Sequence, residues 1–245
     1  MLGLLSCEKD TIVVNVIKPK KIIVLTEDYQ DTTHYYYSGQ NITKTESKDG
    51  LSLYEYRKEK LFKIKYFRKG DKIPFLYNEF EYNSENKLTK LKFYLNVNST
   101  VEEWKGEPID SYKLSAYYEY KYRGDKVMEF YHENSIDTYV LIEFDSNKNI
   151  VMKTERGDHN KQYIRKYTYD SKNHFFKNIN YPVYGEISST VNNILTEEKI
   201  YLSWSEETGI TVIDSTKIKT TYTYNEDDYP VKIECDKKTV LIEYE

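Results

Sequence analysis

The chain has 245 residues, with 36 Lys or Arg against 40 Asp or Glu, and a net charge of −4 at pH 7. Because this balance creates no overall positive potential, the composition argues against a nucleic-acid-binding protein and against attraction to an anionic membrane. The 27 tyrosines and only two cysteines indicate a folded domain without a disulfide framework, in which strands bury aromatic rings and keep hydroxyls in water.

The first seven residues resemble the end of a bacterial lipoprotein signal peptide, because Leu4-Leu5-Ser6-Cys7 matches the lipobox. The resemblance implies that Cys7 carries a lipid that anchors the chain to a membrane, with residues 8–11 as a short tether. A signal peptide has an apolar region of about 7 to 15 residues, so the natural precursor is expected to start further upstream. The alternative is that Leu4-Leu5-Ser6-Cys7 begins an ordinary buried strand, but the polar Glu8-Lys9-Asp10 that follows favours the tether.

From Tyr35 onward one short pattern recurs: an aromatic, a polar residue, a second aromatic, a polar loop of four or five residues, and an apolar residue. Alternation of this kind is typical of a strand with one buried face, and the tight loops predict β-hairpins. The seven copies are Tyr35-Tyr36-Tyr37 before Ile42, Tyr54-Glu55-Tyr56 before Leu61, Phe80-Glu81-Tyr82 before Leu88, Tyr120-Lys121-Tyr122 before Val127, Ile142-Glu143-Phe144 before Ile150, Tyr167-Thr168-Tyr169 before Phe175, and Tyr222-Thr223-Tyr224 before Pro230.

The loops of this pattern predict specific turns. Four of them have five residues and begin with a side chain that can accept a hydrogen bond from the backbone two residues on, namely Asn83, Asp145, Asp170 and Asn225. Their fourth positions are expected to adopt the left-handed conformation, and they are Asn86, Lys148, Asn173 and Asp228. In two of the shorter loops Gly39 and Gly124 supply the backbone freedom.

Further strands are expected at residues 12–17, 21–25, 112–118, 199–204, 211–213 and 240–244, and no amphipathic helix is evident. The second aromatics of the pattern lie 19, 26, 40, 22, 25 and 55 residues apart, which argues against a solenoid of fixed period. We therefore predict an all-β fold, an antiparallel meander that forms one long, twisted and curved sheet, either a half-pipe or a partly closed barrel. Residues 12–245 are expected to form this single domain.

The one basic stretch, residues 57–72, has two interpretations. Lys63 and Lys65 alternate with Phe62, Ile64 and Tyr66, which is the composition of a groove for single-stranded nucleic acid. The same alternation describes a strand whose lysines face water, and the acidic net charge favours this second interpretation.

Two similar segments carry a tryptophan beside two carboxylates. They are Val101-Glu102-Glu103-Trp104 and Trp204-Ser205-Glu206-Glu207. A tryptophan can stack on a sugar ring, so Trp104 and Trp204 are candidate ligand-binding residues, and the glutamates are candidate catalytic residues of a glycoside hydrolase. The structural alternative, which we favour, is that both segments are loops with packed indoles and solvated glutamates.

The sequence predicts neither a metal site nor a cofactor. His34, His132, His159 and His174 are dispersed, and no phosphate-binding glycine loop or serine-hydrolase elbow is present. Asp170 and His174 flank one loop and are interpreted as solvated instead of catalytic. Cys235 alternates with Val231 and Ile233, so it is expected to be a small buried residue; the alternative, a reactive thiol, lacks a recognisable base.

Two copies of the repeated pattern carry a family resemblance. Tyr167-Thr168-Tyr169-Asp170-Ser171-Lys172-Asn173 and Tyr222-Thr223-Tyr224-Asn225 resemble the YD repeat of Rhs-type bacterial proteins. Such hairpins behind a lipobox are similar to surface lipoproteins of Bacteroides and its relatives. The resemblance covers roughly residues 35–245 and implies a β-sheet domain at the outer membrane or cell surface, but it implies no catalytic residue.

These observations lead to two hypotheses about function. The first is a non-enzymatic, lipid-anchored surface protein that uses its aromatic sheet to bind a polysaccharide or another surface protein. The second is a polysaccharide-processing enzyme that uses Glu102 or Glu103 together with Glu206 or Glu207. A structural role in the cell envelope is what remains if neither binding nor catalysis is found.

Overall fold

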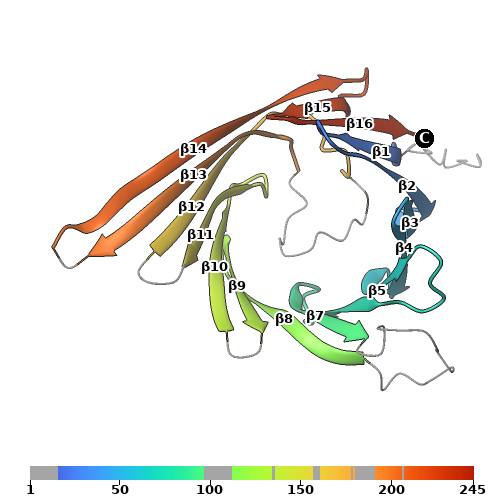
Figure 1. The fold of residues 1–245 in the computed structure, drawn as a ribbon, viewed down its shortest axis with the longest axis horizontal. Coiled ribbons are helices and arrows are strands. Elements are labelled where there is room, and N and C mark those ends of the chain that lie inside the picture. Colours follow the sequence, from blue (N-terminus) through green and yellow to red (C-terminus); the bar gives the residue numbers. More distant parts are fainter. Residues whose placement is uncertain are drawn as a thin grey trace, which may run out of the picture.

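The computed structural model describes residues 16–96, 112–133, 136–156, 161–177, 179, 191–205 and 207–245. They form sixteen antiparallel strands that follow one another in chain order around a closed barrel (Figure 1). No helix in these ranges has the length and apolar character needed to cross a bilayer. The strands are β1 (Pro19–Leu25), β2 (Gln30–Ser38), β3 (Asn41–Ser47), β4 (Gly50–Arg57), β5 (Lys60–Arg68), β6 (Leu76–Tyr82), β7 (Leu88–Asn96), β8 (Tyr112–Arg123), β9 (Lys126–Glu133), β10 (Ile136–Phe144), β11 (Ile150–Arg156), β12 (Lys161–Tyr169), β13 (Ile194–Ser205), β14 (Gly209–Tyr224), β15 (Pro230–Cys235) and β16 (Lys238–Tyr244).

The prediction of an all-β antiparallel meander is confirmed, but the sheet is more closed than the predicted half-pipe or partly closed barrel. β1 pairs with β16 over its whole length, with Ile22 opposite Ile242 on the buried face. On the outer face Lys21 and Glu243 form an ion pair of 2.5 Å. Closure pairs the backbone of the first and last strands, which in an open sheet would be exposed edges.

Alternation along the strands separates an apolar inner face from a charged outer face. Ile42, Ile64, Leu91 and Ile142 point inward and are completely buried. The outward residues between them form Lys–Glu ion pairs: Lys44–Glu46, Lys63–Glu79, Lys65–Glu55, Lys92–Glu81, Lys126–Glu143 and Lys232–Glu234. Lys63 and Lys65 thus belong to a strand with water-facing lysines, as the second interpretation of the basic stretch predicts.

All loops of the repeated pattern lie at one end of the barrel, which we call the tyrosine end; the other we call the open end. The predicted turns are present in three of the five-residue loops, where the fourth residues Asn86, Lys148 and Asp228 have φ angles of 67°, 69° and 62°. The first residues accept backbone hydrogen bonds, as Asn225 Oδ1 does from the Tyr229 N–H at 2.9 Å. These loops are local structures, determined by side chains within a few residues.

The second aromatic of the pattern has a long-range role. Its hydroxyl donates a hydrogen bond to a backbone carbonyl at the start of a strand in the preceding hairpin. The bonds are Tyr37 to Pro19 (2.7 Å), Tyr82 to Leu61 (2.9 Å), Tyr122 to Leu88 (2.7 Å) and Tyr169 to Ile150 (2.5 Å). Tyr244, which ends β16 outside the seven copies, makes the same kind of bond to Pro230 (2.7 Å). Tyr222, the first aromatic of its copy, makes the equivalent bond to Ile194 at 2.8 Å. These hydroxyls link successive hairpins around the tyrosine end.

One copy of the pattern does not form the predicted tight hairpin. Tyr169 pairs with Ile194 instead of Phe175, so residues 170–193 form a long insertion between β12 and β13. Within the insertion, Phe176 and Ile179 are buried against the inner-face residues Ile22, Ile42 and Ile242. The wall side chains of a sixteen-stranded barrel do not meet across its interior, so a segment from within the chain fills this part of it.

The other predicted strands at residues 21–25, 112–118, 199–204, 211–213 and 240–244 all lie within observed strands, whereas residues 12–17 fall mostly outside the described ranges. Cys235 is half-buried, not fully buried as predicted, because it is the last residue of β15 and stands beside the turn to β16.

Candidate functional site

A partly open polar cavity of about 310 Å³ lies on the inner side of the barrel wall, from β8 to β12. Two tyrosines, Tyr118 and Tyr131, line it together with the charged residues Glu129, Lys153, Glu155 and Arg165. All six occupy inward positions of their strands, where the alternation elsewhere places apolar residues. A group of charges inside a barrel with a charged exterior is the most distinctive feature of the described residues.

The strand register brings these charges together from distant parts of the chain. On β10, Val140 lies opposite Glu129 of β9 on one side and Glu155 of β11 on the other. One step toward the tyrosine end, Lys153 of β11 lies opposite Arg165 of β12. The cavity wall therefore has an acidic row near the open end and a basic row behind it.

Two of the charged residues, Glu129 and Lys153, are deeply buried, and the other two, Glu155 and Arg165, are partly exposed and form an ion pair. Glu129 and Lys153 are only 5% and 4% exposed, and Arg165 Nη2 lies 3.1 Å from Glu155 Oε1. Burial lowers the pKa of the Arg165 guanidinium. The negative charge of Glu155 and the contact between Arg165 and Tyr167 outweigh burial, so the pKa of Arg165 is raised overall. Burying a charged group costs free energy unless a group of opposite charge lies close to it. The two acids and two bases of this cavity are therefore expected to stabilise one another.

The tyrosines complete the wall on the open-end side. The rings of Tyr118 and Tyr131 have centroids 4.9 Å apart, and the Tyr131 hydroxyl donates a 2.5 Å hydrogen bond to Glu133 Oε2. This bond, followed by burial, raises the pKa of Tyr131 to about 12, so the phenol stays protonated at neutral pH. The cavity thus offers aromatic rings beside charged donors and acceptors.

This arrangement favours a ligand that both donates and accepts hydrogen bonds and carries little net charge. Guanidinium and ammonium groups are donors only and carboxylates accept, so each row of the wall suits one half of such a ligand. Within the described ranges, no three His, Cys, Asp or Glu side chains are grouped as ligands for a metal ion.

Of the lipidation, ligand-binding and catalytic residues proposed from the sequence, the structure describes only Trp204 and Glu207. Cys7, Glu102, Glu103, Trp104 and Glu206 are outside the described residues, as is His159. Trp204 is 46% exposed and pairs with Ile210 near the tip of the β13–β14 hairpin, and Glu207 is exposed in the adjacent turn. Neither lines the cavity.

The cavity residues were not predicted from the sequence, although one position in it pointed to them. On β9, Val127, Glu129 and Tyr131 occupy successive inward positions, so Glu129 is a carboxylate within an otherwise apolar alternation. Such a position indicates either an error in the strand assignment or a functional site. The cavity residues come together only through the pairing of five strands, β8 to β12.

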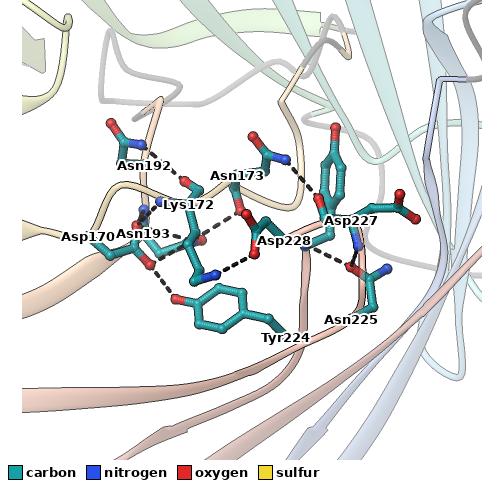
Figure 2. Close-up of polar contacts among 10 residues, drawn as sticks. Asp170, Lys172, Asn173, Asn192, Asn193, Tyr224, Asn225, Asp227 and Asp228 are labelled. Carbon is teal, nitrogen blue, oxygen red and sulfur yellow. Dashed lines mark hydrogen bonds and ion pairs between the residues drawn. The ribbon is translucent and has the colours of Figure 1, made fainter.

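A second polar cluster lies where the insertion meets the wall (Figure 2). Asp170 Oδ1 accepts hydrogen bonds from the backbone N–H groups of Asn193 (3.0 Å) and Lys172 (3.1 Å), while Oδ2 accepts from Asn193 Nδ2 (3.1 Å) and from the Tyr224 hydroxyl. Lys172 also pairs with Asp228. Because these bonds join both ends of the insertion to each other and to β14, we interpret the cluster as an anchor for the insertion.

His174, which the sequence placed in a solvated loop, is instead half-buried in the insertion, against the rings of Phe175 and Phe176. Burial lowers its pKa to about 4, partly offset by the charge of Asp170. Its Nδ1 accepts a hydrogen bond from the Phe176 N–H at 3.3 Å, a role that requires an unprotonated Nδ1.

Fold and cavity together define the chain as a sixteen-stranded antiparallel β-barrel with an internal insertion and a polar interior site. No protein-family model and no curated protein sequence matches it. Among solved structures it is similar to a porin-like protein from Bacteroides uniformis, with a TM-score of 0.41 and 10% identity over 93% of this chain and 96% of that one. It is also similar to part of the TcdB2-TccC3-Cdc42 structure, with a TM-score of 0.32 and 9% identity over 84% of this chain and 13% of that one. At these scores neither likeness carries a function to this chain.

Proposed function

We propose that this protein is a lipid-anchored cell-surface binding protein that takes a carbohydrate chain into the polar cavity of its barrel. The observation that carries the proposal is the cavity wall, where Glu129, Glu155, Lys153 and Arg165 stand beside two tyrosines. Sugar hydroxyls both donate and accept hydrogen bonds, and the flat faces of sugar rings pack against aromatic rings. The balanced charge of the wall favours a neutral saccharide over a polyanion.

The barrel's polarity supports a position outside the bilayer, held by a lipid at Cys7. A barrel that spans a membrane presents an apolar band to lipid, whereas these strands present Lys–Glu pairs along their outer faces. Pro19 and Tyr244 both lie at the tyrosine end. A tether leading to Cys7 would therefore hold the tyrosine end toward the membrane and direct the open end, with the cavity, away from it.

The binding proposal is tested by Glu155→Gln, measured by glycan array and then by calorimetry with the best oligosaccharide. Glu55→Gln is the matched control, because Glu55 forms a similar half-exposed pair with Lys65 on the outer face. We expect Glu155→Gln to weaken binding about tenfold or more and Glu55→Gln to leave it unchanged. No glycan binding by the wild type, or equal binding by both variants, would contradict a carbohydrate site in the cavity.

The anchor is tested separately by Cys7→Ser in the full precursor. The wild type should fractionate with membranes and incorporate a labelled fatty acid, and the variant should do neither. A wild-type protein that remains in the soluble fraction without label would disprove the anchor and leave the cavity proposal standing.

A glycoside hydrolase remains the second candidate. Its specific support is that Glu129 and Glu155 face one cavity on either side of Val140. The acids first considered, Glu102, Glu103, Glu206 and Glu207, stay part of this hypothesis. Chromatography of oligosaccharides incubated with the protein distinguishes the two functions: products that disappear in Glu129→Gln indicate the enzyme, and unchanged substrate indicates the binder.

A further inference from the structure

β14 has a long unpaired edge. The strand runs from Gly209 to Tyr224, yet its pairing with β15 covers only Thr220 to Tyr224. Residues 209–219 therefore have a neighbouring strand on one side alone, β13, among the described residues. In Figure 1 the β13–β14 hairpin extends beyond the barrel wall as an arm. The backbone along this edge presents N–H and C=O groups that a further strand can pair with.

The arm is also exposed on its faces. All eight residues from 210 to 217 are exposed, and the apolar ones are among the most exposed in the described chain: Ile210 is 66%, Val212 65% and Ile213 59% exposed. Trp204 pairs with Ile210 and adds its ring to the same apolar stretch. Contiguous exposed apolar residues on an open strand edge are typical of an interaction surface.

Charge along the edge indicates what pairs with it. Glu207 stands at the hairpin tip, the apolar residues and then Asp214 follow, and Lys217 and Lys219 lie toward the barrel. The edge is therefore acidic at the tip and basic toward the barrel, with the apolar residues Ile210, Val212 and Ile213 and the acidic Asp214 between. Such an edge is complementary to itself when turned around, because antiparallel pairing about Ile213 sets Glu207 of each copy against Lys219 of the other and brings the two Ile213 side chains together.

We propose that two copies of this chain pair antiparallel along the edge of residues 207–219, related by a two-fold axis at Ile213, so that Glu207 of each copy lies opposite Lys219 of the other. The pairing joins the two arms into one sheet and covers Ile210, Val212 and Ile213 of both copies. Other occupants of the edge, a foreign peptide strand or a lipid surface, do not account for the opposite charges at its two ends. The cavity lies between β8 and β12, away from this edge, so the proposal is independent of carbohydrate binding.

The test is sedimentation velocity of the full chain over a wide concentration range, with charge-reversal variants. The wild type should show a monomer–dimer equilibrium. Lys219→Glu places like charges together at both ends of the paired edge, and we expect it to raise the dimer dissociation constant about tenfold or more. Adding Glu207→Lys to Lys219→Glu exchanges the two charges and should restore the dimer. Lys20→Glu, an exposed lysine on β1, is the matched control and should have no effect.

The double variant separates specific pairing from other causes. A misfolded arm or a non-specific aggregate would not be rescued by exchanging charges. A wild type that stays monomeric at every concentration, or a dimer insensitive to Lys219→Glu, would overturn the proposal. Flotation of the monomer with neutral lipid vesicles, lost in Ile210→Lys, would also overturn it and assign the arm to a lipid surface.

Discussion

The hydroxyl of Tyr82 on β6 donates a 2.9 Å hydrogen bond to the backbone carbonyl of Leu61 on β5. Leu61 is the first apolar residue after one tight loop and Tyr82 the last aromatic before the next. The same relationship recurs around the tyrosine end, so the repeated pattern encodes a contact between successive hairpins in addition to the hairpins themselves. A phenylalanine would bury the same ring and lose this contact, which explains the preference for tyrosine.

The first prediction concerns this bond. Tyr82→Phe removes the donor and leaves the half-buried Leu61 carbonyl without it, which should lower the free energy of unfolding by about 1 kcal/mol. The measurement is urea unfolding followed by circular dichroism. Tyr139→Phe, on an exposed ring of the outer face, is the control and should change stability by less than about 0.5 kcal/mol. Equal stability of the two variants would show that the hydroxyl bonds contribute nothing.

The second prediction adds a hydroxyl where the repeated pattern lacks one and tests whether the protein becomes more stable. Phe144 occupies the second aromatic position of its copy and has no hydroxyl. By the repeat, the carbonyl it would reach belongs to Val127, the first apolar residue after the preceding loop. Phe144→Tyr should therefore raise the free energy of unfolding by up to about 1 kcal/mol in the same assay. A loss of stability would mean that the repeat is broken at this hairpin.

The anchor of the insertion gives a third prediction. In Asp170→Asn one of the two carboxylate oxygens becomes an NH₂ group that faces hydrogen-bond donors. We therefore expect the free energy of unfolding to fall by about 1–3 kcal/mol. Limited proteolysis should then cut within residues 171–193 faster than in the wild type. Asp228→Asn removes only a half-exposed pair with Lys172 and is the control. Unchanged proteolysis in Asp170→Asn would contradict the anchoring role.

His174 predicts a pH dependence of stability. Its folded pKa of about 4 lies below its ordinary value of 6.5, so the unfolded chain binds the proton more tightly. The contribution of this histidine to the free energy of unfolding is therefore at its full value above pH 6.5. It falls by about 3 kcal/mol as the pH decreases toward 4. His174→Gln should remove that part of the acid sensitivity in urea titrations at pH 7.5 and pH 4. His34→Gln, at an exposed position, should keep the wild-type profile, and identical profiles for all three proteins would refute the assignment.

The amino-acid sequence by itself determined the hairpins and their turns. Alternating aromatics specify strands, and Asn83, Asp145 and Asn225 specify turns through bonds to backbone groups within four residues. Such interactions act between near neighbours in the chain and need no knowledge of the rest of the fold. The same local reasoning failed at Asp170, where an equivalent loop start leads into the insertion.

Tertiary structure alone decided the closure of the barrel, the place of the insertion and the content of the interior. Lys21 and Glu243 meet from opposite ends of the chain, Phe176 packs on strands far away in sequence, and Glu129 shares a cavity with Arg165 through three strand pairings. Each of these contacts depends on the register of every strand pair between the two residues. A shift of one residue in any pair would turn the side chains to the opposite face of the sheet. Local sequence specifies the strands and their turns, and the long-range pairing of the strands assembles the site.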